Sequence, residues 1–264
     1  MPRFKLTIEY DGRPYIGWQR QADGPTVQEC LEDAVFAFSG ERVEVAGAGR
    51  TDKGVHATGQ VAHIELSGTR FDAGTVMNAI NALIRPEPIA VVAAEAAADD
   101  FHARFSANER RYRYEILNRR APPAIHQGKV WHVAVPLDVD AMHAAAQRLV
   151  GHHDFTSFRA TQCQSASAEK TLDQLDIFRE GEDRIVAIAR SRSFLHHQVR
   201  NMVGTLKLVG EGKWTEDRVS EALAARRRAA AGPTAPADGL YLTGVGYPDE
   251  IEAKPQAGHK PQTQ

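Results

Sequence analysis

Short segments in which apolar and polar residues alternate recur along the whole chain, and they constrain the fold more than any other feature. In the first, the apolar residues Phe4, Leu6, Ile8 and Tyr10 stand at every second position. This alternation is typical of a strand that buries one face. Further strands are expected over residues 43–45, 60–66, 89–93, 109–118, 171–178, 184–189 and 240–245.

Amphipathic helices are expected between these strands. The clearest begins after Thr26, which has capping-box spacing to Glu29, and ends at Gly40. Other helical patterns cover residues 72–83, 140–150, 195–209 and 215–228. The apolar faces of these helices must pack against a sheet, and the connections between the expected strands are short. We therefore predict an α+β fold with a largely antiparallel sheet.

The chain divides into two parts of similar organisation. Its 264 residues are enough for about two domains. Strands and helices are interleaved in each part, so we expect two similar α+β halves, residues 1–105 and 106–248, that share the sheet. The polar tail, 249–264, is rich in Lys, Pro and Gln and is expected to be disordered.

Composition narrows the possible functions. Lys and Arg total 32 against 34 for Asp and Glu, and this net charge of −2 excludes a protein whose whole surface attracts nucleic acid but allows a local basic cleft. The two cysteines, Cys30 and Cys163, lie far apart, which argues against a disulfide scaffold or a zinc finger. No apolar run reaches the roughly 18 residues of a membrane span. We therefore expect a cytoplasmic protein without a signal peptide.

The stretch Gly49 to His56 is the most informative motif. It places Asp52 between Arg50 and Lys53 on a glycine-rich loop that connects two strands. Nearby positive charge lowers the pKa of a carboxyl group, and an ionised aspartate on a loop suits a nucleophile or a general base. The alternative is structural, with Asp52 capping the loop backbone in an Asx-type turn.

In a second motif, at positions 110–114, arginines alternate with aromatic residues. On a strand, Tyr112 and Tyr114 share one face, whereas Arg111 and Arg113 share the other. Rings that stack on bases and guanidinium groups that hold phosphates are typical of RNA recognition. A half-exposed strand with its tyrosines packed inward explains the pattern equally well.

Paired histidines, His196-His197 and His152-His153, raise the question of a metal site. Adjacent residues diverge by about 100° on a helix, and no third ligand lies at an obvious spacing. We therefore expect no metal.

Together with several further motifs, these segments resemble the tRNA pseudouridine synthase A family. The order and rough spacing of the motifs match from Phe4 to about Tyr247. The segments that carry the resemblance are Tyr10-Asp11-Gly12, Gly17-Trp18-Gln19, 49–56, Arg104-Phe105-Ser106-Ala107, 111–114, His153-Asp154-Phe155, 157–160, 193–196 and 199–204. These segments form five separate blocks, and five blocks in the right order are far more specific than any one of them.

The resemblance implies a fold, a reaction and partners. The fold is two α+β halves joined through a continuous antiparallel sheet, with the active site in the cleft between them. The reaction isomerises uridine to pseudouridine at positions 38, 39 and 40 of the tRNA anticodon arm. Members use no cofactor and act as homodimers, with the tRNA lying across both subunits.

The resemblance also assigns roles to individual residues. Asp52 would act at C1′ of the ribose, either as a nucleophile or as a base that drives elimination through a glycal. Tyr112 would stack on the flipped uracil, with Tyr114 as the alternative. Arg50 would fill the space that the base vacates or grip a phosphate, and Arg200 would hold Asp52 through a charge-assisted hydrogen bond.

The sequence also predicts a basic RNA-binding surface and leaves two alternative functions open. The basic residues expected to line the RNA-binding cleft are Arg50, Lys53, Arg111, Arg113, Arg190 and Arg192. One alternative is a pseudouridine synthase that acts on other RNA uridines, since only the docking surface selects the site. A non-catalytic RNA-binding protein or chaperone is the alternative from a different class.

Overall fold

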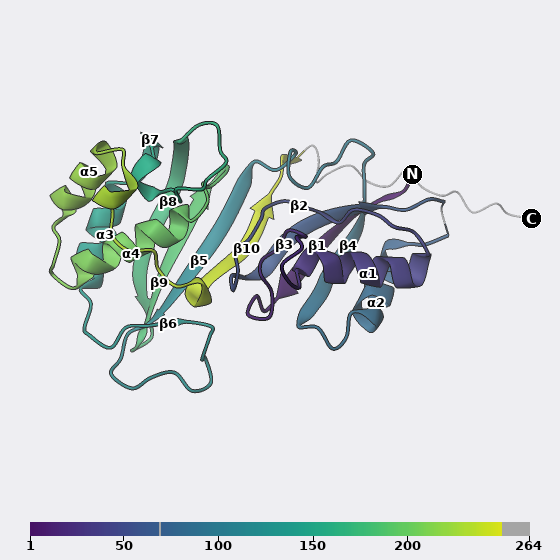
Figure 1. Ribbon diagram of the computed structural model, residues 1–264, viewed down its shortest axis with the longest axis horizontal. Coiled ribbons are helices and arrows are strands. Elements are labelled where there is room, and N and C mark those ends of the chain that lie inside the picture. The colour runs from purple at the N-terminus through teal and green to yellow at the C-terminus, as the bar shows by residue number, and fades with distance from the viewer. Residues whose placement is uncertain (69, 250–264) are drawn as a thin grey trace, which may run out of the picture.

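The computed structural model describes residues 1–68 and 70–249, and ten strands of this part form a single sheet (Figure 1). The strands are β1 (Arg3–Tyr10), β2 (Ala46–Gly47), β3 (His56–Glu65), β4 (Ile89–Ala97), β5 (Glu109–Leu117), β6 (Trp131–His132), β7 (Gly151–Asp154), β8 (Glu169–Glu180), β9 (Arg184–Ser191) and β10 (Leu240–Gly246). The helices are α1 (Val27–Ser39), α2 (Ala73–Leu83), α3 (Val139–Gln147), α4 (Gln198–Gly210) and α5 (Glu216–Ala224). The α+β prediction is confirmed.

The last strand joins the early strands to the later ones. The order across the sheet is β4-β1-β3-β10-β5-β9-β8-β7, with β2 on β3 and β6 on β5. Strand β10 pairs parallel to β3 and antiparallel to β5, so it lies between strands that come from opposite sides of residue 105. In Figure 1, β10 crosses the middle of the molecule, with α1 and α2 beside one end of the sheet and α3, α4 and α5 beside the other.

The core follows the periodicity of the sequence. Phe4, Leu6 and Ile8 of β1 are buried and belong to the same apolar cluster as Leu31 and Val35 of α1. The Thr26 side chain accepts a hydrogen bond from the Glu29 backbone N–H, and Gly40 ends the helix in the left-handed region at φ 76°. Both helix ends are therefore where the capping residues predict them.

One helix begins later than expected, and the difference matters for the site. The spacing predicts a helix from Leu195, but α4 begins at Gln198. The Leu195 N–H donates to Gln198 Oε1 at 2.8 Å, and His197 takes a left-handed backbone with φ 63°. Residues 195–197 thus form a turn that leads into the helix, so helical spacing does not describe their side chains.

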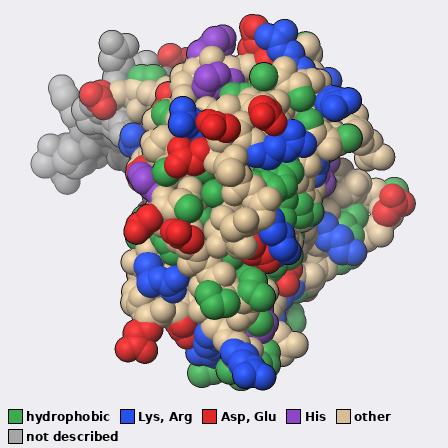
Figure 2. Space-filling model, turned by 90° about the vertical axis from the view of Figure 1, so that its left-hand side faces the viewer, with side chains coloured by type: hydrophobic (Ala, Val, Ile, Leu, Met, Phe, Trp, Pro, Cys, Tyr) green, Lys and Arg blue, Asp and Glu red, His purple; other side chains and the backbone are tan. Residues whose placement is uncertain are grey.

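Charges of both signs are interspersed at one end of the molecule. Figure 2 views the end formed by α5, β7 and their neighbours, and it shows acidic and basic side chains mixed over that face. Ion pairs there join Arg148 to Glu216 at 3.2 Å and Arg218 to Glu221 at 2.8 Å. Such a face has no concentrated positive charge with which to attract a polyanion.

Two further expectations concern the C-terminal tail and membrane-spanning segments. Apart from Asp249, the tail expected to be disordered lies outside the described residues. Within the described part, no helix combines the length and apolar character that a bilayer crossing requires.

Candidate active site

A cleft of about 1770 Å³ opens where segments from both sides of the sheet meet. Its walls include residues from five stretches that are far apart in the sequence, 16–21, 47–53, 102–105, 162–165 and 193–200. Asp52, Arg50, Tyr112 and Arg200 all line it. The structure therefore brings together the four residues that the sequence singles out.

Asp52 enters this cleft from the loop between β2 and β3, which is held by the segment after β1. The Trp18 N–H donates to the Thr51 carbonyl at 3.0 Å, and Gly17 pairs with Asp52 in an isolated β-bridge. Gly17 has φ +136°, and a Cβ at this position would lie 2.8 Å from the Thr51 oxygen. Only glycine fits here, which explains the Gly17-Trp18 motif physically.

Three basic side chains surround the Asp52 carboxylate. Arg200 Nη1 lies 3.2 Å from Oδ2, His196 Nε2 lies 3.1 Å from Oδ1, and His197 Nε2 lies 3.3 Å from Oδ2. Burial is the largest single influence on the pKa of Asp52 and raises this pKa. The hydrogen bond from His196 and the charges of the three basic side chains together outweigh the effect of burial. The pKa of Asp52 therefore lies below its usual value, and the group is ionised at neutral pH.

The two histidines differ in how firmly they hold a proton. The hydrogen bond to Asp52 raises the pKa of His196 against the opposing effect of burial. Burial lowers the pKa of His197 despite the attraction of the same carboxylate. Because a left-handed residue in a turn has no periodic signature, sequence reasoning did not find this pair beside Asp52.

Asp52 stands beside the pair as a third possible metal ligand. One ligand atom from each of Asp52, His196 and His197 lies within 4.8 Å of the others, although no third ligand lies at an obvious spacing from the histidines in the sequence. Arg200, however, already places a fixed positive charge against Oδ2. That charge opposes a second cation at the same oxygen, and we interpret the cluster as ion pairs around Asp52.

The two candidate tyrosines have different surroundings. Tyr112 lines the cleft, and its ring meets Phe194 edge-on with the centroids 5.2 Å apart. Burial and the charge of Asp52 raise the pKa of Tyr112, so its hydroxyl keeps its proton. Tyr114 is fully buried, and its hydroxyl donates to the Pro236 carbonyl at 2.7 Å. Of the two rings, only that of Tyr112 faces the cleft.

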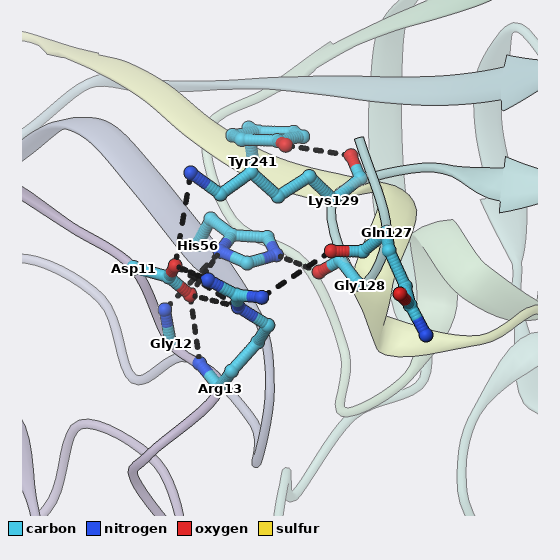
Figure 3. Close-up of polar contacts among 8 residues, drawn as sticks. All are labelled: Asp11, Gly12, Arg13, His56, Gln127, Gly128, Lys129 and Tyr241. Atoms are coloured by element: carbon cyan, nitrogen blue, oxygen red, sulfur yellow. Dashed lines mark hydrogen bonds and ion pairs between the residues drawn. The ribbon is translucent and has the colours of Figure 1, made fainter. Parts of the chain in front are cut away.

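A polar network holds the other end of the Asp52 loop. His56 Nδ1 accepts the Gly12 N–H at 3.1 Å, and its Nε2 lies 3.1 Å from the Gly128 carbonyl, so the proton of the neutral ring is on Nε2. A Cβ on Gly12 would lie 2.0 Å from the Val55 oxygen, which accounts for the glycine of the Asp11-Gly12 motif. Figure 3 shows the His56 ring beneath Tyr241, surrounded by Asp11, Gly12, Arg13, Gln127, Gly128 and Lys129.

The basic lining of the cleft differs from the prediction. Arg50 and Lys53 line it and are exposed, but Arg111, Arg113, Arg190 and Arg192 do not. Residues alternate between the faces of β5, so the side that presents Tyr112 to the cleft excludes its two neighbours. The cleft instead includes Arg104 and Lys170.

The chain is similar in sequence to known tRNA-modifying enzymes. The family model described as tRNA pseudouridine synthase matches residues 6–106 and 145–248. A protein of Rhodospirillum rubrum named tRNA pseudouridine synthase A is 59% identical over 258 residues, which cover 98% of this chain and 92% of that protein. Proteins of the same name from Rhodospirillum centenum and a Caulobacter species are each 60% identical, over 94% and 95% of this chain and 100% of their own lengths.

Proposed function

The chain belongs to the tRNA pseudouridine synthase family and isomerises uridine to pseudouridine in tRNA, and we propose that it acts at positions 38, 39 and 40 of the anticodon arm with Asp52 as the reacting carboxylate. The assignment of Asp52 is supported by the side chains that surround its carboxylate. The carboxylate is ionised, lies in the cleft and is oriented by Arg200, His196 and His197.

The reaction requires an anion beside the ribose. The N1–C1′ bond breaks, the uracil turns within the site, a C5–C1′ bond forms, C5 loses its proton and N1 gains one. Breaking the glycosidic bond builds positive charge at C1′, which an ionised carboxylate stabilises. Asp52 either attacks C1′ or removes a ribose proton to give a glycal.

Tyr112 provides the surface for the displaced base. A uridine inside the arm must leave its stack before its ribose can reach Asp52, at a cost of a few kcal/mol. Stacking on an aromatic ring returns about 1–3 kcal/mol per base. Tyr112 lies at the cleft wall, close enough to Asp52 for the carboxylate to influence its pKa.

Two arginines have separate tasks in this proposal. Two hydrogen bonds fix the guanidinium group of Arg200. Its Nε donates to the Ala235 carbonyl at 2.8 Å, and its Nη1 donates to the Asp52 carboxylate. It therefore holds the carboxylate in one rotamer. Arg50 is exposed in the cleft two residues from Asp52, and it fills the vacated stack or binds a phosphate.

The proposal also covers assembly, location and cofactors. The chain works as a homodimer that binds tRNA across both subunits, in the cytoplasm and without a cofactor or membrane partner. The family resemblance is the support for these statements. Light scattering of the purified protein should give twice the mass of one chain, and a monomer mass would contradict the dimer.

Single-uridine substrates test the proposed positions. Anticodon stem-loops are prepared with one uridine at position 38, 39 or 40, or with one uridine elsewhere in the loop as the control. Pseudouridine should form in the first three and not in the control. Turnover of the control alone would favour a synthase for other uridines, and binding of all four without turnover would favour a non-catalytic RNA-binding protein.

A further inference from the structure

Phe105 is a large apolar side chain that the fold leaves in the open. It is 73% exposed, and it lines the same cleft as Asp52 and Tyr112. Single exposed apolar residues are common on protein surfaces and need no explanation by themselves. Phe105 differs from these in the rigidity of its support and in the groups beside its ring.

The backbone around Phe105 is closed into a tight turn. The His102 N–H donates to Ser106 Oγ at 3.0 Å, and the Ser106 N–H donates to the His102 carbonyl at 2.9 Å. His102 Nδ1 also accepts the N–H groups of Arg104 at 3.1 Å and Phe105 at 3.4 Å. The turn therefore presents an exposed ring from a well-ordered backbone.

Arg110 fixes this turn relative to the reacting carboxylate. Its buried guanidinium donates to the carbonyls of Arg104 at 2.7 Å, Ala48 at 2.9 Å and Arg192 at 2.7 Å. Ala48 precedes the Asp52 loop, and Arg192 precedes the turn that carries His196. One side chain thus ties together the three segments that carry Phe105, Asp52 and the Asp52-binding histidines.

The groups beside the ring match a nucleotide. The guanidinium of Arg104 lies 5.6 Å from the centroid of the Phe105 ring, and the His102 ring lies 4.4 Å from it, tilted by 43°. Proteins that bind single-stranded RNA combine an aromatic ring for the base with a nearby cation for the phosphate. The uracil that reacts has its own ring at Tyr112, beside Asp52.

We propose that Phe105 and Arg104 form a second nucleobase site, which takes an unstacked base next to the target uridine and its phosphate. This inference rests on the proposed function, because it assumes that RNA occupies the cleft. When the target nucleotide flips, its neighbour loses a stacking partner. An aromatic ring on a hydrogen-bonded turn in the same cleft replaces that partner and holds the loop open around Asp52.

Replacing the ring tests the site. Phe105→Ala should weaken binding of an anticodon stem-loop by about 5- to 100-fold, as the loss of one base–aromatic stack does. Phe105→Trp should bind within about threefold of wild type, since any aromatic face stacks on a base. Phe105→Leu should bind as weakly as the alanine variant, because leucine is apolar but has no π-face. Leucine binding like wild type would show that only apolar contact matters and would overturn the proposal.

Phe36 offers a matched control outside the cleft. It is 38% exposed on α1, and the guanidinium of Arg42 lies 3.8 Å from its ring centroid. Phe36→Ala should leave RNA binding unchanged. Equal binding by Phe105→Ala, Phe36→Ala and wild type would refute the second site, as would a change in oligomer mass confined to Phe105→Ala, which would assign the ring to a second copy of the chain.

Abasic substrates identify the base and separate the two proposals. Each loop nucleotide next to the target is replaced in turn by an abasic residue. For one such RNA, the difference between Phe105→Ala and wild type should disappear, and persistence of the full difference in every RNA would contradict stacking. Failure of the wild-type protein to form pseudouridine would sink the proposed function, whereas normal turnover with no effect at Phe105 would sink only this inference.

Discussion

The arginines on the outer face of β5 and the basic residues that line the cleft differ in what surrounds them. On the face opposite the cleft, Arg113 lies 2.8 Å from Glu115 and 2.5 Å from Glu180, and Arg111 lies 3.1 Å from Glu109. On the cleft side, Arg50 and Lys53 have no hydrogen bond or ion pair among the described residues. Basic side chains that already form ion pairs with carboxylates contribute little to the attraction of a phosphate, whereas basic side chains without such a partner are free to bind one.

The comparison teaches that residue type alone does not identify an RNA contact. The Arg111–Arg113 segment looks the most like an RNA-binding motif, yet its arginines serve the opposite face of the sheet. The cleft uses the alternate positions of the same strand, Arg110 for structure and Tyr112 for the wall. Substitutions on the two faces should therefore have very different effects.

The largest effect is expected from Asp52→Asn on the cleft side. The change keeps the size of the side chain but removes the negative charge, so turnover should fall by more than about 1000-fold. Binding of tRNA should stay within several-fold of wild type. Single-turnover assays and filter binding measure the two quantities, with Asp33→Asn on the exposed surface of α1 as the control. Turnover within tenfold of wild type would remove Asp52 from its role.

Arg200→Gln should have the next largest effect. Losing a hydrogen bond to a charged group costs about 1.5–3 kcal/mol, so kcat should fall by about 10- to 100-fold. Because the Arg200 charge helps to lower the pKa of Asp52, the acid limb of the kcat/KM profile should move to higher pH. Arg113→Gln on the opposite face is the control, and a matching loss of kcat there would erase the difference between the faces.

The salt dependence of binding sharpens the comparison quantitatively. Arg50→Gln and Lys53→Gln should each reduce the slope of log Kd against log salt concentration by about 0.7–0.9, the value for one lost phosphate contact. Arg111→Gln and Arg113→Gln should leave the slope unchanged because their partners are carboxylates. Fluorescence anisotropy with one labelled stem-loop at several salt concentrations measures all four. Equal slopes for all variants would place the RNA elsewhere.

The smallest effect concerns His196 and is a dependence of stability on pH. The folded-state pKa of His196 is raised, so its pairing with Asp52 stabilises the protein fully below pH 6.5 and progressively less as pH rises through the folded pKa. His196 is 41% exposed, and solvent screening limits the contribution to below about 1 kcal/mol.

Thermal unfolding of His196→Gln measures this contribution. The variant should have a lower Tm than wild type at pH 6, and the difference should vanish in alkaline solution, where the wild-type histidine is neutral. His152→Gln, an exposed histidine on β7, should show no such trend. A Tm difference that stays constant with pH would mean that His196 acts through packing rather than charge.

Local patterns were sufficient for much of the fold. The alternation in β1, the Thr26 cap and the Gly40 stop of α1 depend on residues within a few positions of one another, and the structure matches each of them. The very short strands β6 and β7 were not anticipated, since two to four residues carry no readable period. Asp52 was singled out from its own loop, with the family resemblance adding to that assignment.

The sequence by itself therefore determined the longer elements, the α+β class and the motif that carries Asp52. Only the tertiary structure decided which side chains meet there. Asp52 and Arg200 are 148 positions apart, and the turn at residues 195–197 that aims both histidines at the carboxylate depends on a left-handed His197. The insertion of β10 between β3 and β5 likewise joins segments that no local pattern relates. Periodicity and capping act over one or two turns of chain, whereas these contacts arise from packing between distant segments, which no short window of sequence records.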